Sequence, residues 1–543
     1  MLHSGSFGLF AIAVAGCCAQ TPVILISVDT LRADRIGPHT PNIGRYAQGG
    51  TLFTSAETQI PLTLPSHTTL MTSTYPFQNG VEENAGHVPP NLTTLASVLH
   101  DRGYRTAAFI GSIFLEKQLG LDRGFDVYDS PFEFGAFSTL DGSMVFAGGP
   151  QNPLTVRERR PGALVLRAAK QWLATQRGQP VFLFAHLFDV HKPYRFGSYD
   201  AEVASVDKLL GDFADTLKRE GWWDRSLVVL TADHGEGLGE HGESDHGYFV
   251  YESTLHVPLI VHWPSDARKF PARVEQPVGL IDVAPTILDF LKIPVPDSFR
   301  GTGFRPGSAN PVIGESTYGR DCFGWSPLRA IRVGALKYIE APKPELYDIG
   351  KDPRELTNLI DIRRSDAAML KAQLGKLMTR RASSSQPAAG DPQRNKEVLQ
   401  SLGYLAPGPA RVVKGPAADP KDKLPELLRY EDALDLMEAK RYDESIAILR
   451  AIVTADAGNL LARRDLGVAL IEKHDFRAAL DELQRVAAAS PDDYVTRYEM
   501  GIAQEGLGHL PEALSQFESA CRIAPAARQC KEAAERVRRS PTK

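Results

Sequence analysis

Hydrophobic residues between positions 21 and 360 come in short, β-branched runs that are separated by amphipathic stretches. Residues 92–102 and 161–176 have the apolar spacing of helices, and the second stretch begins at a proline and is followed by Gly178. Strands that alternate with helices predict βαβ units. We therefore expect an α/β domain over residues 21–379, with a doubly wound, mostly parallel sheet that has helices on both faces.

Three of the apolar runs are followed by side chains of the types that commonly bind metal ions in proteins. The runs are residues 23–26, 181–184 and 227–230. Ligands of open α/β sheets bind just beyond the carboxyl ends of parallel strands, so the side chains after the runs are expected to meet. A lone aspartate there is usually a helix cap, but three such ends favour a metal site. The side chains are Asp29 after the first run, His186, Asp189 and His191 after the second, and Asp233 and His234 after the third.

A glycine-rich loop follows the third run and adds further polar side chains. It carries Glu236, Glu240 and His246. We take His241 and Glu243 of the same loop to be ordinary polar loop residues and exclude them from the site.

Length, charge and cysteine content narrow the class of protein. A chain of 543 residues is too long for a single core and predicts two or more domains. The formal net charge is -5 and no long basic run is present, so no nucleic-acid partner is expected. Five cysteines are too few for a disulfide scaffold. Cys521 and Cys530 either pair within the last helices or, as we favour, are packed thiols.

The N-terminus resembles an export signal. Residues 7–15 form an apolar segment of signal-peptide length, too short for a permanent membrane span. The segment leads into residues 14–17 (VAGC), which resemble the processing box of a bacterial lipoprotein, although no lysine or arginine precedes them. We expect residues 1–20 to direct export to the periplasm or cell envelope, with a lipid anchor at Cys17 as the only membrane attachment. An ordinary cleaved leader or an apolar tail is the alternative.

Composition changes after residue 379. Residues 380–424 are rich in serine, proline, glycine and alanine and predict a linker, with a short docked helix at residues 397–405. In the following part, similar residues recur 34 positions apart, as at Tyr442, Phe476 and Leu510, and at Gly467 and Gly501. This period resembles the tetratricopeptide repeat, a helix-turn-helix unit.

The repeats predict an all-α solenoid over residues 425–543. About three repeats extend from residue 429 to residue 526, and a polar capping helix ends near Arg539. Such units bury a core only by stacking, and the stack leaves a concave face. We expect a protein or peptide to bind there; a spacer or dimerisation arm is the alternative.

Residues 59–80 carry a motif that resembles the sulfatase signature. In that signature a cysteine or serine, followed by x-Pro-x-Arg, opens a helix, and a TGxYPxxxG-like stretch comes next. The chain matches at residues 63–66 (TLPS), at Tyr75-Pro76 and at Gly80. Other landmarks of the family occur in the family's order, at residues 29–34, 189–194, 231–242, 256–264, 282–294 and 345–359. The resemblance covers nearly the whole first domain and implies the alkaline phosphatase fold.

Several residues depart from the sulfatase pattern. Thr63 stands at the cysteine or serine that sulfatases convert to formylglycine, and His67 replaces the arginine. His234 stands where many sulfatases have asparagine, and His246 lies where they often have lysine. These residues look like those of phosphoethanolamine and phosphoglycerol transferases, which belong to the same superfamily and use a metal-bound threonine. Exchange of an oxygen ligand for imidazole moves the preference from Ca²⁺ toward Zn²⁺ or Mn²⁺.

The resemblance implies a metal site made by Asp29, Thr63, Asp233 and His234. A divalent ion is expected, Zn²⁺ or Mn²⁺ by preference, with Ca²⁺ and Mg²⁺ as alternatives. Taken alone, Thr63 and Asp29 could each be a helix cap, so the assignment depends on their place in the series of landmarks.

The resemblance also implies groups that handle protons and negative charge. His191 and His246 would form a second metal site or donate a proton to the leaving oxygen, although His191 alone could be a turn residue. Arg32 and Lys337 would neutralise the anionic ester substrate. Backbone N–H groups at the start of a helix after Thr63 would assist them.

We therefore expect an exported, metal-dependent hydrolase or transferase that cleaves phosphate monoesters or diesters through a covalent Thr63 ester. A threonine cannot re-form an aldehyde to release sulfate, whereas its phosphate ester can be attacked by water or an alcohol. A sulfuric ester hydrolase is the first alternative. A scaffold that acts only through its repeats is the second, and the clustered Asp29, Asp233 and His234 argue against it.

Overall fold

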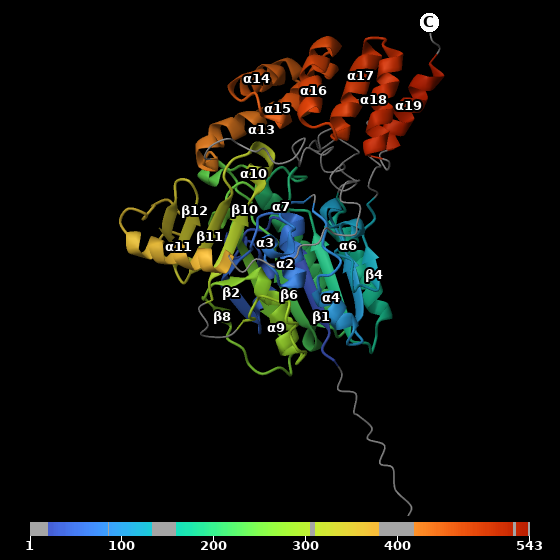
Figure 1. Cartoon of the computed structure of the whole chain (residues 1–543). Coiled ribbons are helices and arrows are strands. Elements are labelled where there is room, and N and C mark those ends of the chain that lie inside the picture. Colours follow the sequence, from blue (N-terminus) through green and yellow to red (C-terminus); the bar gives the residue numbers. More distant parts are fainter. Residues whose placement is uncertain are drawn as a thin grey trace, which may run out of the picture.

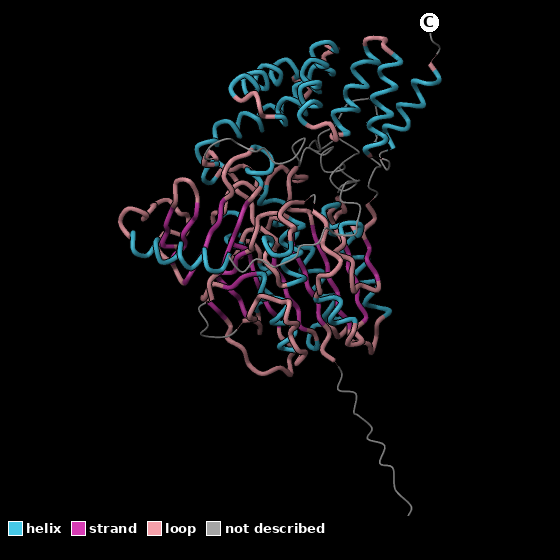
Figure 2. The backbone as a smooth tube through the Cα atoms, in the orientation of Figure 1, coloured by secondary structure: helices cyan, strands magenta, loops and turns pink. Residues whose placement is uncertain are grey.

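The computed structural model describes residues 20–84, 86–132, 159–304, 310–378, 417–524 and 528–540. The expected leader with its anchor at Cys17, and the expected helix at residues 397–405, lie outside these residues. An α/β domain comes first, and a row of antiparallel helices lies along one end of it (Figure 1). In the described parts of the chain, strands occur only in the first domain, as Figure 2 shows.

The large sheet has nine strands in the order β4-β3-β5-β1-β6-β7-β2-β8, with β9 paired to β2. The strands from β4 to β6 are parallel to one another, whereas β7 runs antiparallel to both β6 and β2. The expected mostly parallel α/β sheet is therefore confirmed. Its strands are β1 (Val23–Val28), β2 (Thr51–Glu57), β3 (Arg105–Phe109), β4 (Val127–Asp129), β5 (Val181–Leu187), β6 (Leu227–Thr231), β7 (His256–His262), β8 (Arg273–Val274) and β9 (Val278–Gly279).

The three apolar runs singled out in the sequence are the centre of this sheet. They form β1, β5 and β6, and every residue of these strands is buried. Strands buried on both faces have no polar side to expose, which explains why they lack an alternating pattern.

Helices flank the large sheet. The stretch expected at residues 161–176 forms α6, and that at residues 92–102 forms the shorter α4. Among the described residues no helix combines the length and the apolar character that crossing a bilayer requires. The helices of this domain are α1 (Pro41–Ala47), α2 (Thr63–Thr72), α3 (Pro76–Asn79), α4 (Leu95–His100), α6 (Gly162–Thr175), α7 (Tyr199–Arg219), α8 (Glu252–Leu255), α9 (Val283–Phe290), α10 (Tyr318–Phe323) and α11 (Arg364–Met378).

A second, antiparallel sheet of four strands was not expected from the sequence. It contains β10 (Val312–Ser316), β11 (Leu328–Val333), β12 (Leu336–Glu340) and β13 (Glu345–Asp348), in that order. Helix α11 packs on it through Ala367, Leu370 and Leu374. The strands have only four to six residues each and carry charged residues, so no long apolar run marks them in the sequence.

The C-terminal part forms the helical hairpins that the 34-residue period predicts. Gly467 and Gly501 lie where two helices of a hairpin touch. A Cβ atom at Gly467 would lie 2.6 Å from Leu483 Cγ, and one at Gly501 would lie 2.5 Å from Phe517 Cε1. A side chain at either position would have to displace the facing leucine or phenylalanine, so glycine suits this close approach. The helices are α13 (Leu424–Glu438), α14 (Tyr442–Ala455), α15 (Leu460–Glu472), α16 (Phe476–Ala489), α17 (Tyr494–Gly506), α18 (Leu510–Ile523) and α19 (Arg528–Arg539).

A buried cluster of charges joins the two sheets of the first domain. Lys337 Nζ on β12 lies 2.9 Å from carboxylate oxygens of both Glu252 and Glu355. Arg332 Nη1 on β11 lies 2.6 Å from Glu57 Oε1 on β2 and 3.1 Å from Glu252 Oε2. Burial alone would lower the pKa of Lys337, but the surrounding carboxylates raise it above its ordinary value.

The expectation that Lys337 neutralises an anionic substrate is therefore wrong. Its side chain is fully buried, and its ammonium group is taken up by two glutamates of the protein. The lysine holds the second sheet against the first.

We predict that Lys337→Met lowers the free energy of unfolding by about 3–5 kcal/mol, because it leaves buried carboxylates without their cation. Thermal unfolding of the purified variant checks this. Lys343→Met is the matched control, since that lysine is exposed and pairs only at the surface with Asp422; its melting temperature should stay at the wild-type value. A Lys337→Met protein that melts like wild type would contradict a structural role.

Candidate active site

The three central strands bring the expected metal ligands to one edge of the large sheet. β5, β1 and β6 are neighbours and run parallel, so their carboxyl ends lie side by side. Asp29 directly follows β1, and Asp233 lies two residues after β6. His186 of β5 is paired in register with Ser27 of β1. The structure thus brings together the side chains that the strand-end argument grouped.

Helix α2 brings Thr63 to the same place. The helix begins at Thr63, and all ten of its residues are buried. Thr63 Oγ1 donates a hydrogen bond to Asp29 Oδ2 at 3.3 Å. The structure therefore puts the hydroxyl group beside the carboxylate with which the sequence grouped it.

The backbone N–H groups at the start of α2, which were expected to face the anionic substrate, are largely bonded to other partners. The Leu64 N–H donates to the side-chain oxygen of Asn84 at 2.9 Å, and the Ser66 N–H donates to the Leu62 carbonyl at 3.0 Å. Pro65 has no N–H. The next three residues after Thr63 thus have no free backbone donor to offer, and this part of the expectation is wrong.

Asp29, Asp233 and His234 form a group that fits a metal ion. Their ligand atoms all lie within 4.8 Å of one another, and all three residues are buried. One atom of each has no hydrogen-bond partner in the described part of the chain: Oδ1 of Asp29, Oδ2 of Asp233 and Nε2 of His234. His234 Nδ1 donates to the Gly235 carbonyl at 3.0 Å, so Nε2 is the ring nitrogen that remains to bind a metal. Two carboxylates and an imidazole nitrogen suit Zn²⁺ or Mn²⁺.

Burial also changes the acidity of the two carboxyl groups. It raises the pKa of Asp29 to about 6, and it raises the pKa of Asp233, which the nearby charge of Asp29 raises further. Burial is the largest cause of both shifts, so each expresses the cost of holding a carboxylate charge away from water. A bound cation would remove that cost.

His67 occupies a position that the sequence left without a role. Its Nδ1 donates to the Thr63 carbonyl at 2.7 Å, and its Nε2 accepts from Ser27 Oγ at 3.0 Å. Burial lowers the pKa of His67 to about 3, so the ring is neutral. The imidazole therefore ties the first turn of α2 to β1 and sets the place of Thr63.

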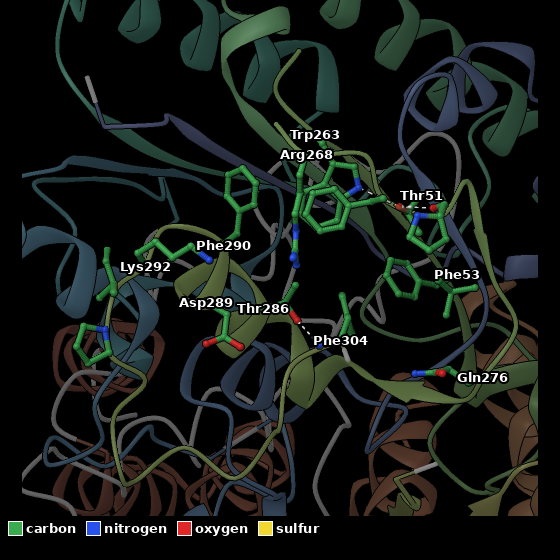
Figure 3. A pocket seen from close by; sticks show the side chains of 15 residues that line it. Thr51, Phe53, Trp263, Arg268, Gln276, Thr286, Asp289, Phe290, Lys292 and Phe304 are labelled. Atoms are coloured by element: carbon green, nitrogen blue, oxygen red, sulfur yellow. Dashed lines mark hydrogen bonds between the residues drawn. The ribbon is translucent and has the colours of Figure 1, made fainter. Parts of the chain in front are cut away.

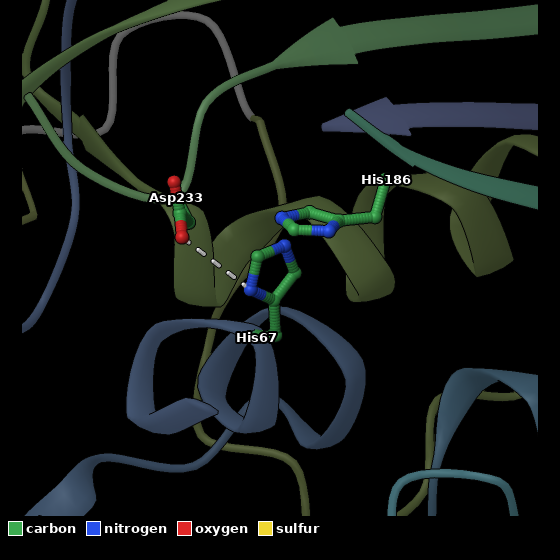
Figure 4. A group of neighbouring side chains, drawn as sticks. All are labelled: His67, His186 and Asp233. Atoms are coloured by element: carbon green, nitrogen blue, oxygen red, sulfur yellow. Dashed lines mark ion pairs between the residues drawn. The ribbon is translucent and has the colours of Figure 1, made fainter. Parts of the chain in front are cut away.

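His67, His186 and Asp233 form a second group whose ligand atoms lie within 4.8 Å (Figure 4). His67 Nδ1 lies 3.6 Å from Asp233 Oδ2, the contact drawn as a dashed line. Both nitrogens of His67 already have partners, however, so this group fits a metal less well than the first. His186 Nε2 instead lies 3.3 Å from Asp29 Oδ2, and this contact helps to fix the position of the Asp29 carboxylate.

His191 and His246 lie beside the metal group rather than in it. The two rings are 5.2 Å apart, and the His246 ring lies 4.3 Å from that of His234. Neither belongs to a three-residue ligand group among the described residues. His191 Nδ1 donates to the Lys192 carbonyl at 2.6 Å, and His246 Nδ1 lies 3.1 Å from Glu236 Oε1. Burial lowers the pKa of both rings, so both are neutral.

Arg32 does not face the site as the sequence analysis expected. Its Nη2 lies 2.7 Å from carboxylate oxygens of both Asp34 and Glu240, and its Nη1 donates to the Glu236 carbonyl at 3.0 Å. Nε also donates to Asp34. Every nitrogen of the guanidinium is used, so Arg32 holds the glycine-rich loop and the expectation of an anion-binding role is wrong.

His241 and Glu243 are loop residues, as expected. His241 Nε2 bonds the Arg354 carbonyl at 3.0 Å, and Glu243 accepts backbone N–H groups from Tyr248 and Phe249 at 2.8 and 3.2 Å. Asp189, which follows β5, accepts the Gly162 N–H at 2.8 Å and caps α6.

Two residues of the site were noted in the sequence but given no function there. His186 interrupts an otherwise apolar strand, and a polar side chain inside a buried run was the signal that could have assigned it. Glu236 is buried beside His246, and burial raises its pKa to about 8. No pattern in the sequence separates Glu236 from the other acids of its loop.

A cavity of about 800 Å³ lies elsewhere, next to the start of β2 and beyond the end of β7 (Figure 3). Because β7 is antiparallel to the central strands, its carboxyl end lies at the edge of the sheet opposite to Asp29 and Asp233. None of the residues expected in the site lines it. Its walls include the aromatic side chains of Phe53, Trp263, Phe270, Phe290 and Phe304, together with polar and charged residues such as Arg268 and Asp289.

Comparison of the sequence with known families agrees with this architecture. A family model described as sulfatase matches residues 22–293, and one described as tetratricopeptide repeat matches residues 436–505. Arylsulfatase K of Bos taurus is 29% identical over 177 residues, which cover 30% of this chain and 32% of that protein. Choline-sulfatase of Rhizobium meliloti (strain 1021) is 34% identical over 187 residues, which cover 32% and 35%. The match thus spans about a third of the length of these relatives.

Solved structures share the fold at low sequence identity. The phosphonate monoester hydrolase of Agrobacterium radiobacter superposes with a TM-score of 0.52 and 21% identity, covering 66% of this chain and 95% of that one. A 2-O GAG sulfatase superposes with a TM-score of 0.54 and 19% identity, covering 74% and 99%. With half of the sequence matched by one family model and the strand-end site in place, the chain belongs to the sulfatase family and carries a C-terminal tetratricopeptide-repeat domain.

Proposed function

We propose that the protein is a metal-dependent ester hydrolase or transferase in which Thr63 is the nucleophile, and that its substrates are phosphate esters. One observation carries the proposal. The Thr63 hydroxyl lies 3.3 Å from Asp29, within a buried group in which one atom each of Asp29, Asp233 and His234 has no hydrogen-bond partner among the described residues. A threonine that only capped a helix would have no need of such neighbours.

The residues that would hold the metal are Asp29, Asp233 and His234, with Thr63 Oγ1 beside them. When bound, a divalent cation supplies positive charge that favours the ionised hydroxyl and offsets the charge of the ester. The same charge would compensate the burial of two carboxylates, which is otherwise costly.

Thr63 then forms the new bond. Its oxygen attacks phosphorus, the bond to the leaving oxygen breaks, and a phosphate ester of Thr63 remains. Asp29 Oδ2 is the acceptor nearest to the hydroxyl proton. His67 and α2 hold the threonine oxygen in place for this attack, because His67 Nδ1 is bonded to the carbonyl of the same residue.

His191 and His246 are the groups we propose for proton transfer at the leaving oxygen and at the incoming water or alcohol. They come from different loops, their rings lie 5.2 Å apart, and the His246 ring lies 4.3 Å from that of His234. With Nδ1–H of His191 bonded to the Lys192 carbonyl, the lone pair of the neutral ring lies on Nε2, so His191 accepts protons. His246 Nδ1 and Glu236 Oε1 lie 3.1 Å apart and share a proton, because burial raises the pKa of Glu236 to about 8. This pair would supply the proton to the leaving oxygen, and His191 would take one from the incoming water or alcohol.

Sulfate-ester hydrolysis is the second candidate, and the names of the relatives favour it, since arylsulfatase K and choline-sulfatase both match. We prefer phosphate because a sulfate ester on Thr63 has no aldehyde to re-form for its release. A phosphonate monoester hydrolase among the structural neighbours supports related chemistry on this fold. Export, a lipid anchor at Cys17 and a protein partner on the repeats belong to the same proposal.

The metal site generates one prediction. Titration of Zn²⁺ or Mn²⁺ into chelator-treated protein should raise its melting temperature, with a stabilisation of about 2.7 kcal/mol when free metal is one hundred times Kd. Asp233→Asn should remove this response, because the buried oxygen it replaces is a ligand. Asp212→Asn, on the exposed side of α7, should keep it. An Asp233→Asn protein that responds like wild type would disprove the site.

The assignment of Thr63 as the nucleophile generates a second prediction. Thr63→Ala should lower kcat on aryl phosphate esters by at least ~1,000-fold, whereas Thr63→Ser, which keeps the hydroxyl, should retain measurable turnover. Peptide mapping of acid-quenched reactions should find the covalent adduct on the peptide that contains Thr63. Full activity of Thr63→Ala, or an adduct on another residue, is incompatible with the mechanism. Turnover of sulfate esters alone would favour the second candidate.

A further inference from the structure

The first repeat helix is fastened to the first domain by aromatic side chains. Phe323 of α10 stacks on Trp325 at 4.4 Å and meets Tyr430 of α13 edge-on at 6.0 Å. These residues belong to one buried apolar cluster that continues through the repeat helices. Figure 1 shows α13 directly above α10. The position of α13 against the first domain is therefore set by a shared core.

A short series of polar contacts connects helix α13 with the glycine-rich loop that carries Ser244 and His246. Ser244 Oγ donates to Glu431 Oε2 of α13 at 2.6 Å. Lys192 Nζ donates to the Ser244 carbonyl at 3.0 Å and pairs with Asp245 Oδ1 at 2.5 Å. Lys192 directly follows His191, and Asp245 directly precedes His246. The contacts thus connect Glu431 with both loops that carry the proton-transfer histidines.

The same loop is also confined by van der Waals contact with α13. Gly242 has φ +81°, and a Cβ atom built there would lie 2.2 Å from Leu424 Cδ2 at the start of α13. The loop therefore lies between α13 on one side and the metal group on the other, where His246 is 4.3 Å from His234. Its shape depends on where α13 lies.

We propose that the repeat domain is a working part of the active site, and that Glu431 is a positioning residue which acts through Ser244. By accepting the Ser244 hydroxyl, Glu431 fixes the loop of residues 240–248 and so orients His246 toward His191. The aromatic contacts of Phe323, Trp325 and Tyr430 attach α13 without the carboxylate. Loss of Glu431 should therefore change the loop and not the attachment of the domains. The kinetic part of this inference rests on the proposed function.

Variants of the full-length protein, including the Glu431→Ala/Ser244→Ala double variant, test the contact between Glu431 and Ser244. Glu431→Ala and Ser244→Ala each remove the hydrogen bond, and Glu431→Gln keeps an oxygen that can accept it. Asp432→Asn, one residue along on the exposed side of α13, is the matched control. Hydrogen–deuterium exchange of residues 240–248 and steady-state kinetics on an aryl phosphate are measured for each, together with the melting temperature.

We expect Glu431→Ala and Ser244→Ala to speed exchange in residues 240–248 and to lower kcat by about tenfold, with KM within about twofold. The double variant should lose no more than either single one, because both act on one bond. Glu431→Gln should recover most of the loss, and Asp432→Asn should match wild type in exchange, kinetics and melting.

Unchanged exchange and unchanged kcat in Glu431→Ala would overturn the proposal, as would additive losses in the double variant. A large fall in melting temperature with exchange raised throughout α13 would also overturn it, since Glu431 would then merely hold the domains together. If wild type turns over no ester, the proposed function fails; faster exchange confined to residues 240–248 would still support the positioning role.

Discussion

Two carboxylates and an imidazole lie buried together at the ends of two neighbouring strands, and one atom of each has no hydrogen-bond partner among the described residues. Removal of a single charge from water costs several kcal/mol unless an opposite charge compensates it. Among the described residues, no lysine or arginine pairs with Asp29 or Asp233. A divalent cation is the compensation that this geometry accepts, and the chemistry proposed for Thr63 depends on it.

The charged residues around this group have different structural roles. Arg32 is fully engaged by Asp34, Glu240 and the Glu236 carbonyl, and it shapes the glycine-rich loop. Lys337 lies in a cluster of glutamates that joins the two sheets. These two basic residues thus support the framework, and in the proposed mechanism charge compensation beside Thr63 is left to the metal. The repeat domain adds a further support through Glu431, on the side of the site where His191 and His246 lie.

The sequence predicted the parts of the site that follow from local pattern. Asp29, Asp233 and His234 each follow an apolar run, and parallel strands place such residues together. The repeat helices followed from a fixed period. His67 could not be assigned in this way, because its role depends on a contact with Ser27, 40 residues away, that only the packing of α2 on β1 creates. Arg32 and Lys337 were misassigned for a related reason: a basic side chain in a sequence does not reveal which carboxylates the fold will bring to it.

The presence of a metal ion between these side chains is tested most directly by diffraction. Crystals grown with Zn²⁺ and measured at the zinc absorption edge should show one anomalous peak about 2 Å from Asp29, Asp233, His234 Nε2 and Thr63 Oγ1. A map without a peak there, or with zinc bound only at other residues while the Thr63 hydroxyl points away, would contradict the account.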